Sequence, residues 1–409
     1  MNKPDSVDVI TKQMKDLLVG PWQHSVGKRA RELRPYLIIV DALDEIEDDG
    51  GSGFLEELLK ASSQGHLRGL KFLVTSRPDP DLAALCSSFN SNVVCRLYEV
   101  PMDTVKDDIM KYLRAKLPAL QDPQLAKLSL KADGLFIYAA TAVRYILLRH
   151  RMTADEQLRR LAELVDHMSS STDTPLLIDT LYRQVLWGAF CKLPDAMFRD
   201  RLRILHTLLC TEERVSTSVA GILADVVDAE MAKVVVEELH AVLYMKDNRV
   251  FWYHASFPDF MFTQERSKFS VPEVDLSRIV DMSCNEPAQH ARLTHSCFCI
   301  MKSSLRFNIC DLPSSFLFDS EVPDLSHRIE KNISNVLQYS CRNWAQHLNR
   351  AGSGDCDSLQ TEIDEFLHVR VLFWIEAMNL LGSRAQCSLM LQKAREWVLK
   401  VGDLMLPQT

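Results

Sequence analysis

Two short, uninterrupted apolar runs near the start of the chain constrain its fold more than any other feature. The first is Tyr36–Val40 (YLIIV), and the second covers residues 71–75 (KFLVT). Runs of this length that are rich in β-branched residues are typical of strands buried on both faces, as in a parallel sheet. Apolar residues at 54–59 predict a helix between them, and the spacing is close to the ~30 residues of a βαβ unit. We therefore predict two parallel strands joined by a right-handed crossover.

Further elements are expected on either side of these runs. Apolar residues between 7 and 18 recur with helical spacing, and Gly20-Pro21 is expected to end that helix. Residues 93–100 are a candidate third strand. From Asp103 onward the alternation of strand and helix disappears, and the pattern becomes helical.

Residues 202–262 have a pattern of their own. Three helices are expected, at 204–209, 217–224 and 229–242, followed by a β-hairpin over 244–253. This order is the outline of a winged helix. Beyond about residue 268 the whole pattern is helical, so the predicted fold class is α/β followed by mostly α. The expected domains are 1–102, 103–200, 201–267 and 268–409.

Charge and hydropathy exclude several classes of protein. The 409 residues have a net charge of −8, and 47 Lys and Arg residues are spread among 55 Asp and Glu residues. The sequence therefore shows no overall positive charge that would indicate binding to nucleic acid. The helix expected at 229–242 has Lys233 as its only Lys or Arg, which argues against DNA contacts. The longest apolar run, residues 135–148, contains Arg144 and is shorter than the ~20 residues of a membrane span. We expect neither nucleic acid nor membrane as a partner.

The cysteines indicate an intracellular protein. Eleven cysteines occur without a C-x-x-C pair, and no signal segment opens the chain, so we expect reduced thiols and a cytoplasmic location. One cluster in the sequence contains Cys284, His290, His295, Cys297 and Cys299. Its spacing matches no usual zinc pattern, and buried thiols on a helix are the better interpretation.

Charged residues follow both predicted strands at the edge where parallel strands end. Asp41, Asp44 and Glu45 come after the first strand, and Arg77 comes after the second. This edge is where α/β folds bind ligands. Asp41 is placed to hold Mg²⁺, Asp44 or Glu45 to orient an attacking water, and Arg77 to sense a γ-phosphate. The alternative is a solvated acidic loop, since the acidic run continues through residues 47–49.

These segments resemble the second half of a NACHT nucleotide-binding domain, in the class of signal-transducing NTPases called STAND. YLIIVDALDE, at 36–45, is similar to the Walker B box, and KFLVTSRPDPDL, at 71–82, is similar to the sensor-1 strand. ADGLFIYAATAVRYI, at 132–146, adds to the likeness. The closest similarity is to the nephrocystin-like NACHT branch that is abundant in fungi.

The resemblance extends to HASFPDFMF, at 254–262, which is similar to the end of that family's winged helix. In the family a histidine at this place contacts bound ADP and holds the closed state, a role that would fall on His254. The alternative is a core histidine that caps the hairpin. The resemblance implies a partial parallel-sheet P-loop NTPase core, a helical lid, a winged helix and a C-terminal helical region, with ATP or ADP and Mg²⁺ as cofactors.

The phosphate-binding loop of that family is missing from the sequence. A P-loop reads G-x-x-x-x-G-K-[S/T], and its backbone N–H groups and Lys cradle the phosphates. The only Gly-Lys pair is Gly27-Lys28, with Trp22 in place of the first Gly and Arg29 in place of the Ser or Thr. We therefore expect a NACHT protein without its N-terminal phosphate-binding part, either naturally short or truncated at the N-terminus. We expect no ATP hydrolysis by this chain alone.

The function expected from the sequence is a signalling or scaffold role derived from an ATP-binding switch. Protein partners are expected, with a homo-oligomer as one option and the tail at 268–409 as the sensing or partner-binding surface. The first alternative is a truncated form of an active, ATP-dependent oligomerising NTPase. The second is an unrelated helical adaptor with a chance Walker B sequence.

Overall fold

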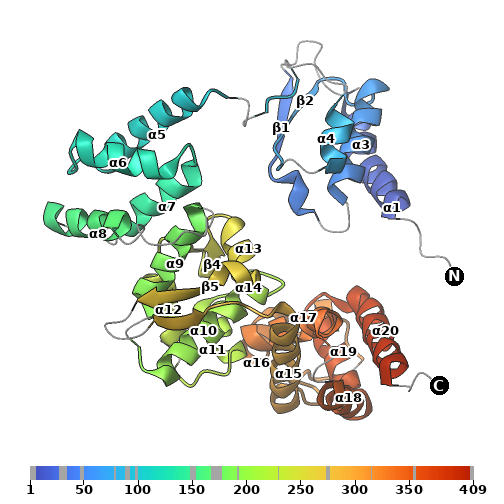
Figure 1. The fold of residues 1–409 in the computed structure, drawn as a ribbon. Coiled ribbons are helices and arrows are strands. Elements are labelled where there is room, and N and C mark those ends of the chain that lie inside the picture. The colour runs from blue at the N-terminus through green and yellow to red at the C-terminus, as the bar shows by residue number, and fades with distance from the viewer. Residues whose placement is uncertain are drawn as a thin grey trace. The chain divides into compact units, whose positions relative to one another are not determined.

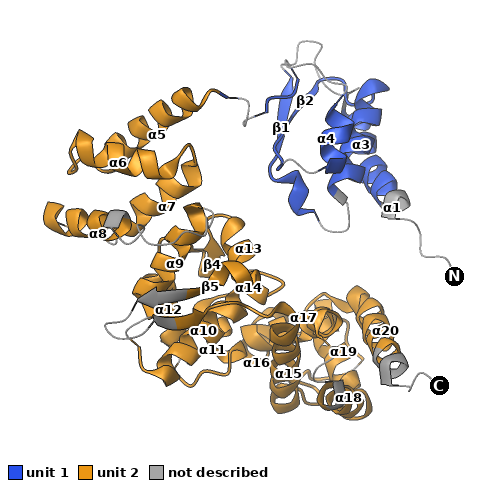
Figure 2. Ribbon diagram, in the orientation of Figure 1, with its two compact units in different colours: residues 1–100 blue, residues 101–409 orange. Residues whose placement is uncertain are grey.

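The structure is a computed structural model with two compact units, Met1–Val100 and Pro101–Thr409, each described here by itself (Figure 2). The division into four domains that we expect from the sequence stays a prediction. The residues that the structure describes are 6–26, 35–46, 50–77, 80–87, 93–96, 100–147, 153–166, 177–190, 193–228, 230–272, 277–314, 316–352 and 356–405.

Unit 1 contains a two-stranded parallel sheet, which confirms the predicted parallel pair (Figure 1). In the register of the pair, Tyr36 lies opposite Leu70 and Val40 lies opposite Val74. The candidate strand at 93–100 is wrong for residues 93–96 and 100, which are irregular, while residues 97–99 lie outside the described part. The elements of unit 1 are α1 (Ser6–Gln13), a π-helical turn (Met14–Val19), α2 (Gly20–Val26), β1 (Tyr36–Val40), α3 (Gly50–Ser63), β2 (Leu70–Val74) and α4 (Pro80–Cys86).

Only one face of this sheet is covered within the described part of unit 1. Phe72 packs with Met14 of the π-helical turn and Leu58 of α3 in a small core. The opposite face carries side chains that are 51–63% exposed, so the prediction of burial on both faces is wrong. An apolar run marks a strand but does not say how many of its faces are covered. The exposed side chains are Leu37, Ile39 and Leu73.

The first helix does not end at Gly20-Pro21, contrary to the prediction. The chain continues through the π-helical turn into α2, and the Gly20 N–H donates to the Lys15 carbonyl oxygen. Pro21 is then the second residue of a new α-helical segment, where the backbone N–H that proline lacks is not needed.

Unit 2 is mostly helical, as predicted, with two antiparallel hairpins among its described residues. Its elements up to residue 267 are α5 (Met102–Lys116), α6 (Asp122–Ala132), α7 (Phe136–Ile146), α8 (Ala154–Asp166), α9 (Leu177–Phe190), α10 (Asp195–Cys210), α11 (Thr217–Leu223), α12 (Met231–Glu238), β3 (Leu243–Lys246), β4 (Arg249–Trp252), α13 (Ser256–Phe262) and α14 (Gln264–Ser267). The elements that follow are β5 (Lys268–Pro272), β6 (Ser277–Asp281), α15 (Glu286–Ser304), α16 (Leu325–Asn332), α17 (Asn335–Arg350), α18 (Cys356–Glu365), a π-helical turn (Phe366–Arg370), α19 (Val371–Leu380) and α20 (Cys387–Met405).

The order of three helices and a hairpin is confirmed: α10, α11 and α12 precede the antiparallel pair β3 and β4. The expectation that everything beyond residue 268 is helical is wrong, because β5 and β6 form a second antiparallel hairpin. Ile279 is 68% exposed and the next residue, Val280, is 5% exposed. This alternation has the period of a strand, but it is too short to stand out in a helical context.

The core of unit 2 is continuous and includes α7, which covers most of the apolar run at 135–148. Tyr138, Ala139, Ala142 and Ile146 are all 0% exposed, as expected for a buried helix of a bundle. Among the helices that the structure describes, none is both long enough and apolar enough to cross a bilayer.

Candidate functional site

The ends of β1 and β2 are tied together through Thr75. Its backbone N–H donates to the Val40 carbonyl oxygen (2.9 Å), and the Leu43 N–H donates to the Thr75 carbonyl oxygen (2.9 Å). The Thr75 hydroxyl donates to the Asp41 carboxylate and accepts from the Ala42 N–H (3.0 Å). Thr75 therefore fixes the start of the acidic segment against the neighbouring strand and orients Asp41.

A left-handed residue turns the chain after β1. Ala42 has φ 54° and ψ 55°, a conformation that costs a residue with a Cβ roughly 1–2 kcal/mol. The 3₁₀ turn Leu43–Glu45 follows, and Leu43 is 1% exposed in the core of unit 1. Burial of Leu43 offsets the backbone strain and anchors the turn that carries two of the acidic side chains.

Arg77 connects to both carboxylates of this turn. Its backbone N–H donates to Asp44 Oδ1 (2.8 Å), its Nε lies 3.1 Å from Asp44 Oδ2, and its Nη2 lies 3.4 Å from Glu45 Oε1. The Ser76 hydroxyl also donates to Asp44 Oδ1 (3.2 Å). Partial burial alone would raise the pKa of Asp44, but the hydrogen bonds and the Arg77 charge outweigh it and lower that pKa. Asp44 is therefore ionised at neutral pH.

At this edge of the sheet the structure joins three of the four predicted residues, Arg77 with Asp44 and Glu45, whereas the Asp41 carboxylate contacts Thr75. The Arg77 guanidinium is paired with the acidic turn, whereas a sensor of a γ-phosphate would face the phosphate. The side chains of Arg77 and Glu45 are 51% and 53% exposed, so solvent screens this pair and it contributes little to stability.

The oxygen atoms at this edge of the sheet are of the kind that bind a hard cation. Asp41 is exposed, and its carboxylate stands beside the Thr75 hydroxyl, so both offer the oxygen ligands that Mg²⁺ prefers. No phosphate-binding loop accompanies them, because the sequence lacks G-x-x-x-x-G-K-[S/T]. The Gly27-Lys28 pair and the acidic residues 47–49 lie outside the described residues.

Gly51 on α3 sets the position of the acidic turn. A Cβ on Gly51 would lie 2.4 Å from the Leu43 carbonyl oxygen, closer than such atoms approach. We expect Gly51→Ala to push the turn away from α3 and to destabilise unit 1 by roughly 1–3 kcal/mol. Hydrogen–deuterium exchange of peptides covering residues 36–63 in the full chain measures this, and we expect faster exchange in the variant.

Gly53→Ala is the matched control on the same helix. Its added Cβ would lie 3.1 Å from Ile10 Cδ1, the end of a flexible side chain that can move. Alanine also favours a helix over glycine by roughly 0.5–1 kcal/mol, so exchange is expected to stay the same or slow. Equal exchange in Gly51→Ala and the wild type would show that the close approach to Leu43 does not hold the turn.

His254 belongs to unit 2 and follows β4. Its side chain is exposed, so it is not a core histidine. Its Nδ1 accepts from the Ser256 backbone N–H (3.1 Å) and lies 2.8 Å from the Ser256 hydroxyl, which in turn lies 2.8 Å from the Tyr182 hydroxyl. The crevice beside it is too narrow to admit a water molecule. These contacts suit a histidine that caps the start of α13, while contact with a nucleotide stays a prediction.

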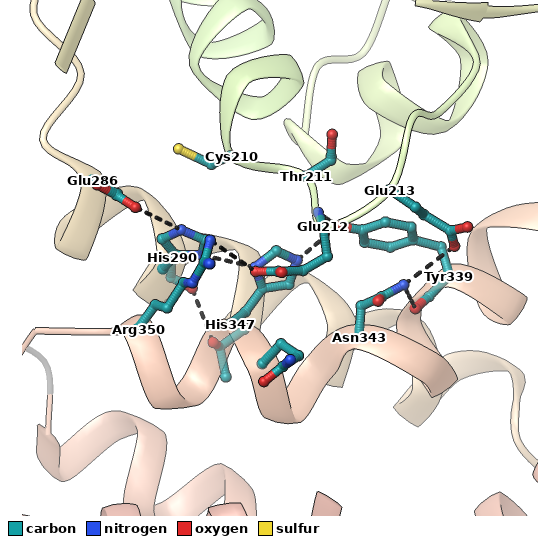
Figure 3. Close-up of polar contacts among 12 residues, drawn as sticks. Cys210, Thr211, Glu212, Glu213, Glu286, His290, Tyr339, Asn343, His347 and Arg350 are labelled. Atoms are coloured by element: carbon teal, nitrogen blue, oxygen red, sulfur yellow. Dashed lines mark hydrogen bonds and ion pairs between the residues drawn. The ribbon is translucent and has the colours of Figure 1, made fainter. Parts of the chain in front are cut away.

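A second group of polar side chains, of which only His290 was a candidate from the sequence, lies in unit 2 (Figure 3). His290 and His347 are both 0% exposed and lie beside Glu212. His290 and His295 are neighbours in the sequence, but His295 contacts Glu362 and not the group around His290. The signal that could have revealed the group is a histidine on the buried face of an amphipathic helix, where an apolar residue is the rule.

Comparisons of the chain with protein-family models, with curated proteins and with solved structures find no match. The interpretation of both groups of residues therefore depends on their own chemistry and, for the strand ends, on the resemblance of the motifs.

Proposed function

We propose that this chain is a NACHT or STAND-type signalling or scaffold protein, derived from an ATP-binding switch and without ATPase activity of its own. One observation carries the proposal: the charged residues of the Walker B-like and sensor-like segments meet at the carboxyl ends of two paired parallel strands. In the ancestral ATP-binding site Asp41 would hold Mg²⁺, Asp44 or Glu45 would orient the attacking water, and Arg77 would face the γ-phosphate.

The finer assignment of the fold belongs to the same proposal. β1, α3 and β2 would be the remaining part of a P-loop NTPase core, and α5 to α9 would be the helical lid. The sequence α10, α11, α12, β3 and β4 would be the winged helix, with His254 at its end. The helices from α15 onward would form the surface for protein partners or for self-association.

Two observations support an inactive and intracellular protein. Arg77 is engaged by the acidic turn, and the sequence has no P-loop to bind the β- and γ-phosphates. Nine cysteines whose side chains the structure describes carry free thiols, which suits the cytoplasmic location expected from the sequence. The alternative is that the same residues belong to an active, oligomerising NTPase whose P-loop is encoded in frame before Met1.

A turnover assay tests the first part of this proposal, that the chain has no ATPase activity of its own. We expect the purified chain to hydrolyse no ATP above background with Mg²⁺ present, because the phosphates lack their main donors. Asp44→Asn is expected to give the same rate as the wild type. Hydrolysis by the wild type that disappears in Asp44→Asn would overturn the proposal and favour the active enzyme.

A grafted protein tests the second part of the proposal, that the chain is derived from an ATP-binding switch. Joining a strand, P-loop and helix of the family type ahead of residue 1 is expected to confer Mg²⁺-dependent ATP binding, measured by calorimetric titration. Asp41→Asn in the graft is expected to remove the Mg²⁺ dependence, and Arg77→Ala to weaken ATP binding at least ~10-fold. The matched control is Lys71→Ala, a charge change on β2 itself. A folded graft that binds no nucleotide would mean that the remaining half-site has drifted from its ancestral geometry, and it would overturn the assignment of Asp41 and Arg77 to a nucleotide site.

A further inference from the structure

Three potential metal ligands from separate segments of unit 2 converge in its interior (Figure 3). Glu212 follows the end of α10, His290 lies on α15 and His347 lies on α17. The two Nδ1 atoms of the histidines are 2.8 Å apart, and His347 Nδ1 lies 3.8 Å from Glu212 Oε1. All three ligand atoms lie within 4.8 Å of one another. Ligands about 2.0–2.1 Å from a tetrahedral zinc ion are ~3.3 Å apart, so small side-chain shifts would close the site.

The Nε2 atom of each imidazole, which points away from the other histidine, faces an oxygen. His347 Nε2 lies 2.7 Å from the Tyr339 hydroxyl oxygen, and His290 Nε2 lies 3.7 Å from Glu286 Oε1. Tyr339 is itself positioned by the Glu212 backbone N–H, which donates to its hydroxyl oxygen (3.2 Å). Histidines that bind a metal through one nitrogen commonly direct the other nitrogen to such an oxygen, which fixes the ring.

The polar groups of this cluster are incompletely satisfied by the protein. The two Nδ1 atoms face each other, so only one of them can carry a hydrogen, which it donates to the lone pair of the other. His290 Nε2 is buried without a hydrogen-bond partner among the described residues. A cation between the two Nδ1 atoms would use both lone pairs and would leave an N–H on each Nε2, directed at Glu286 and Tyr339.

The charges around the cluster also suit a cation. Burial lowers the pKa of His290 to about 4, and burial with the neighbouring His290 and Arg350 lowers the pKa of His347 to about 3. Both imidazoles are therefore neutral at pH 7, the form that binds metals. Arg350 Nη1 lies 3.5 Å from Glu212 Oε1 and competes for that carboxylate, but its side chain is 39% exposed and can turn to solvent.

We propose that Glu212, His290 and His347 bind one divalent transition-metal ion of the zinc class. The ligand atoms would be the two Nδ1 atoms and a carboxylate oxygen, with water in the remaining position. Because the ligands come from the end of α10 and from the packed helices α15 and α17, the ion would join three segments of unit 2 and stabilise their packing. Metal binding by these three side chains requires neither a NACHT origin nor a nucleotide, because none of them belongs to the proposed nucleotide site.

Titration of the metal-free full chain with Zn²⁺ tests the proposal. We expect one equivalent to bind and the unfolding temperature to rise, because the ion binds the folded state. Co²⁺ in place of Zn²⁺ is expected to give the d–d absorption of a low-symmetry site with nitrogen and oxygen ligands. A thiolate charge-transfer band would instead show that cysteines bind the ion, and it would overturn the proposal.

Variants assign the ligands. His347→Gln is expected to abolish binding, and Glu212→Gln is expected to weaken it at least ~10-fold. Because His347 is fully buried and its variant can fail to fold, the partly exposed Glu212 provides the decisive substitution. The matched control is His295→Gln, which removes an exposed histidine of α15 outside the cluster. Absence of binding by the wild type, unchanged affinity in folded Glu212→Gln, or loss of binding in His295→Gln would each overturn the proposal.

Discussion

Between pH 7 and pH 5 we expect the free energy of unfolding of unit 2 to fall by at least about 2 kcal/mol, because a buried histidine is kept neutral. His206 on α10 is 9% exposed, and its Nε2 lies 3.1 Å from the Met282 carbonyl oxygen, to which a neutral ring donates. Burial lowers its pKa from 6.5 to about 4, the nearby Arg292 adds to this effect, and the Met282 carbonyl and Asp281 oppose it.

The direction follows from the two pKa values. Above pH 6.5 neither the folded nor the unfolded protein protonates His206, and its full contribution is present. As the pH falls from about 6.5 to about 4, the unfolded chain takes up a proton that the folded chain excludes, so stability is lost. Below pH 4 both states are protonated and the loss stops. His290 and His347 have pKa values lowered in the same direction and add to the decline.

Urea unfolding of the full chain at pH 7 and pH 5 measures this effect. Five of the six tryptophans lie in residues 101–409, so their fluorescence reports on unit 2. His206→Gln keeps a side-chain N–H donor but cannot be protonated, and we expect its pH dependence to be smaller by about 2 kcal/mol over this range. The control is His327→Gln, which removes an exposed histidine of α16 and is expected to behave as the wild type. An equal pH dependence in all three proteins would refute the role of His206.

The site at the strand ends could be predicted from the sequence because its signals are local. The runs that form β1 and β2 are contiguous, and parallel pairing places whatever follows them at one edge. Asp41 and Arg77 could therefore be assigned to the same edge of the sheet without any knowledge of tertiary packing. The pairing of Arg77 with Asp44 could not be predicted, because it depends on the left-handed conformation of Ala42 and on the burial of Leu43.

The buried cluster of unit 2 could not be predicted, because its geometry is entirely tertiary. His290 and His347 are 57 residues apart and meet only because α15 packs along α17. On each helix the histidine shares a face with apolar residues, and a sequence pattern cannot distinguish a hydrogen-bonded core histidine from a metal ligand.

The exposed face of the sheet in unit 1 was missed for a related reason. Hydropathy counts apolar residues but does not identify what covers them.

Replacing Asp179 with alanine is expected to cost unit 2 about 3–5 kcal/mol of unfolding free energy, since it leaves a guanidinium without its partner. Asp179 on α9 is 3% exposed and Arg266 on α14 is 24% exposed. Arg266 Nη2 donates to Asp179 Oδ1 (2.6 Å), and its Nε donates to Asp179 Oδ2 (3.0 Å), so the pair is bidentate. It ties the helix before the three-helix segment to the chain that follows the β3–β4 hairpin.

A double-mutant cycle separates the ion pair from simple loss of packing. Arg266→Met alone buries an unpaired carboxylate and is expected to be costly, whereas Asp179→Ala with Arg266→Met removes both charges and should cost less than the sum of the single changes. Asp108→Ala breaks an ion pair with Lys111 in which both side chains are more than half exposed, and it is expected to leave stability within error of the wild type. Additive single changes would mean that the two side chains stabilise unit 2 separately. A positive coupling would mean that α9 and α14 are held together by this ion pair, whose two charges neither helix can bury alone.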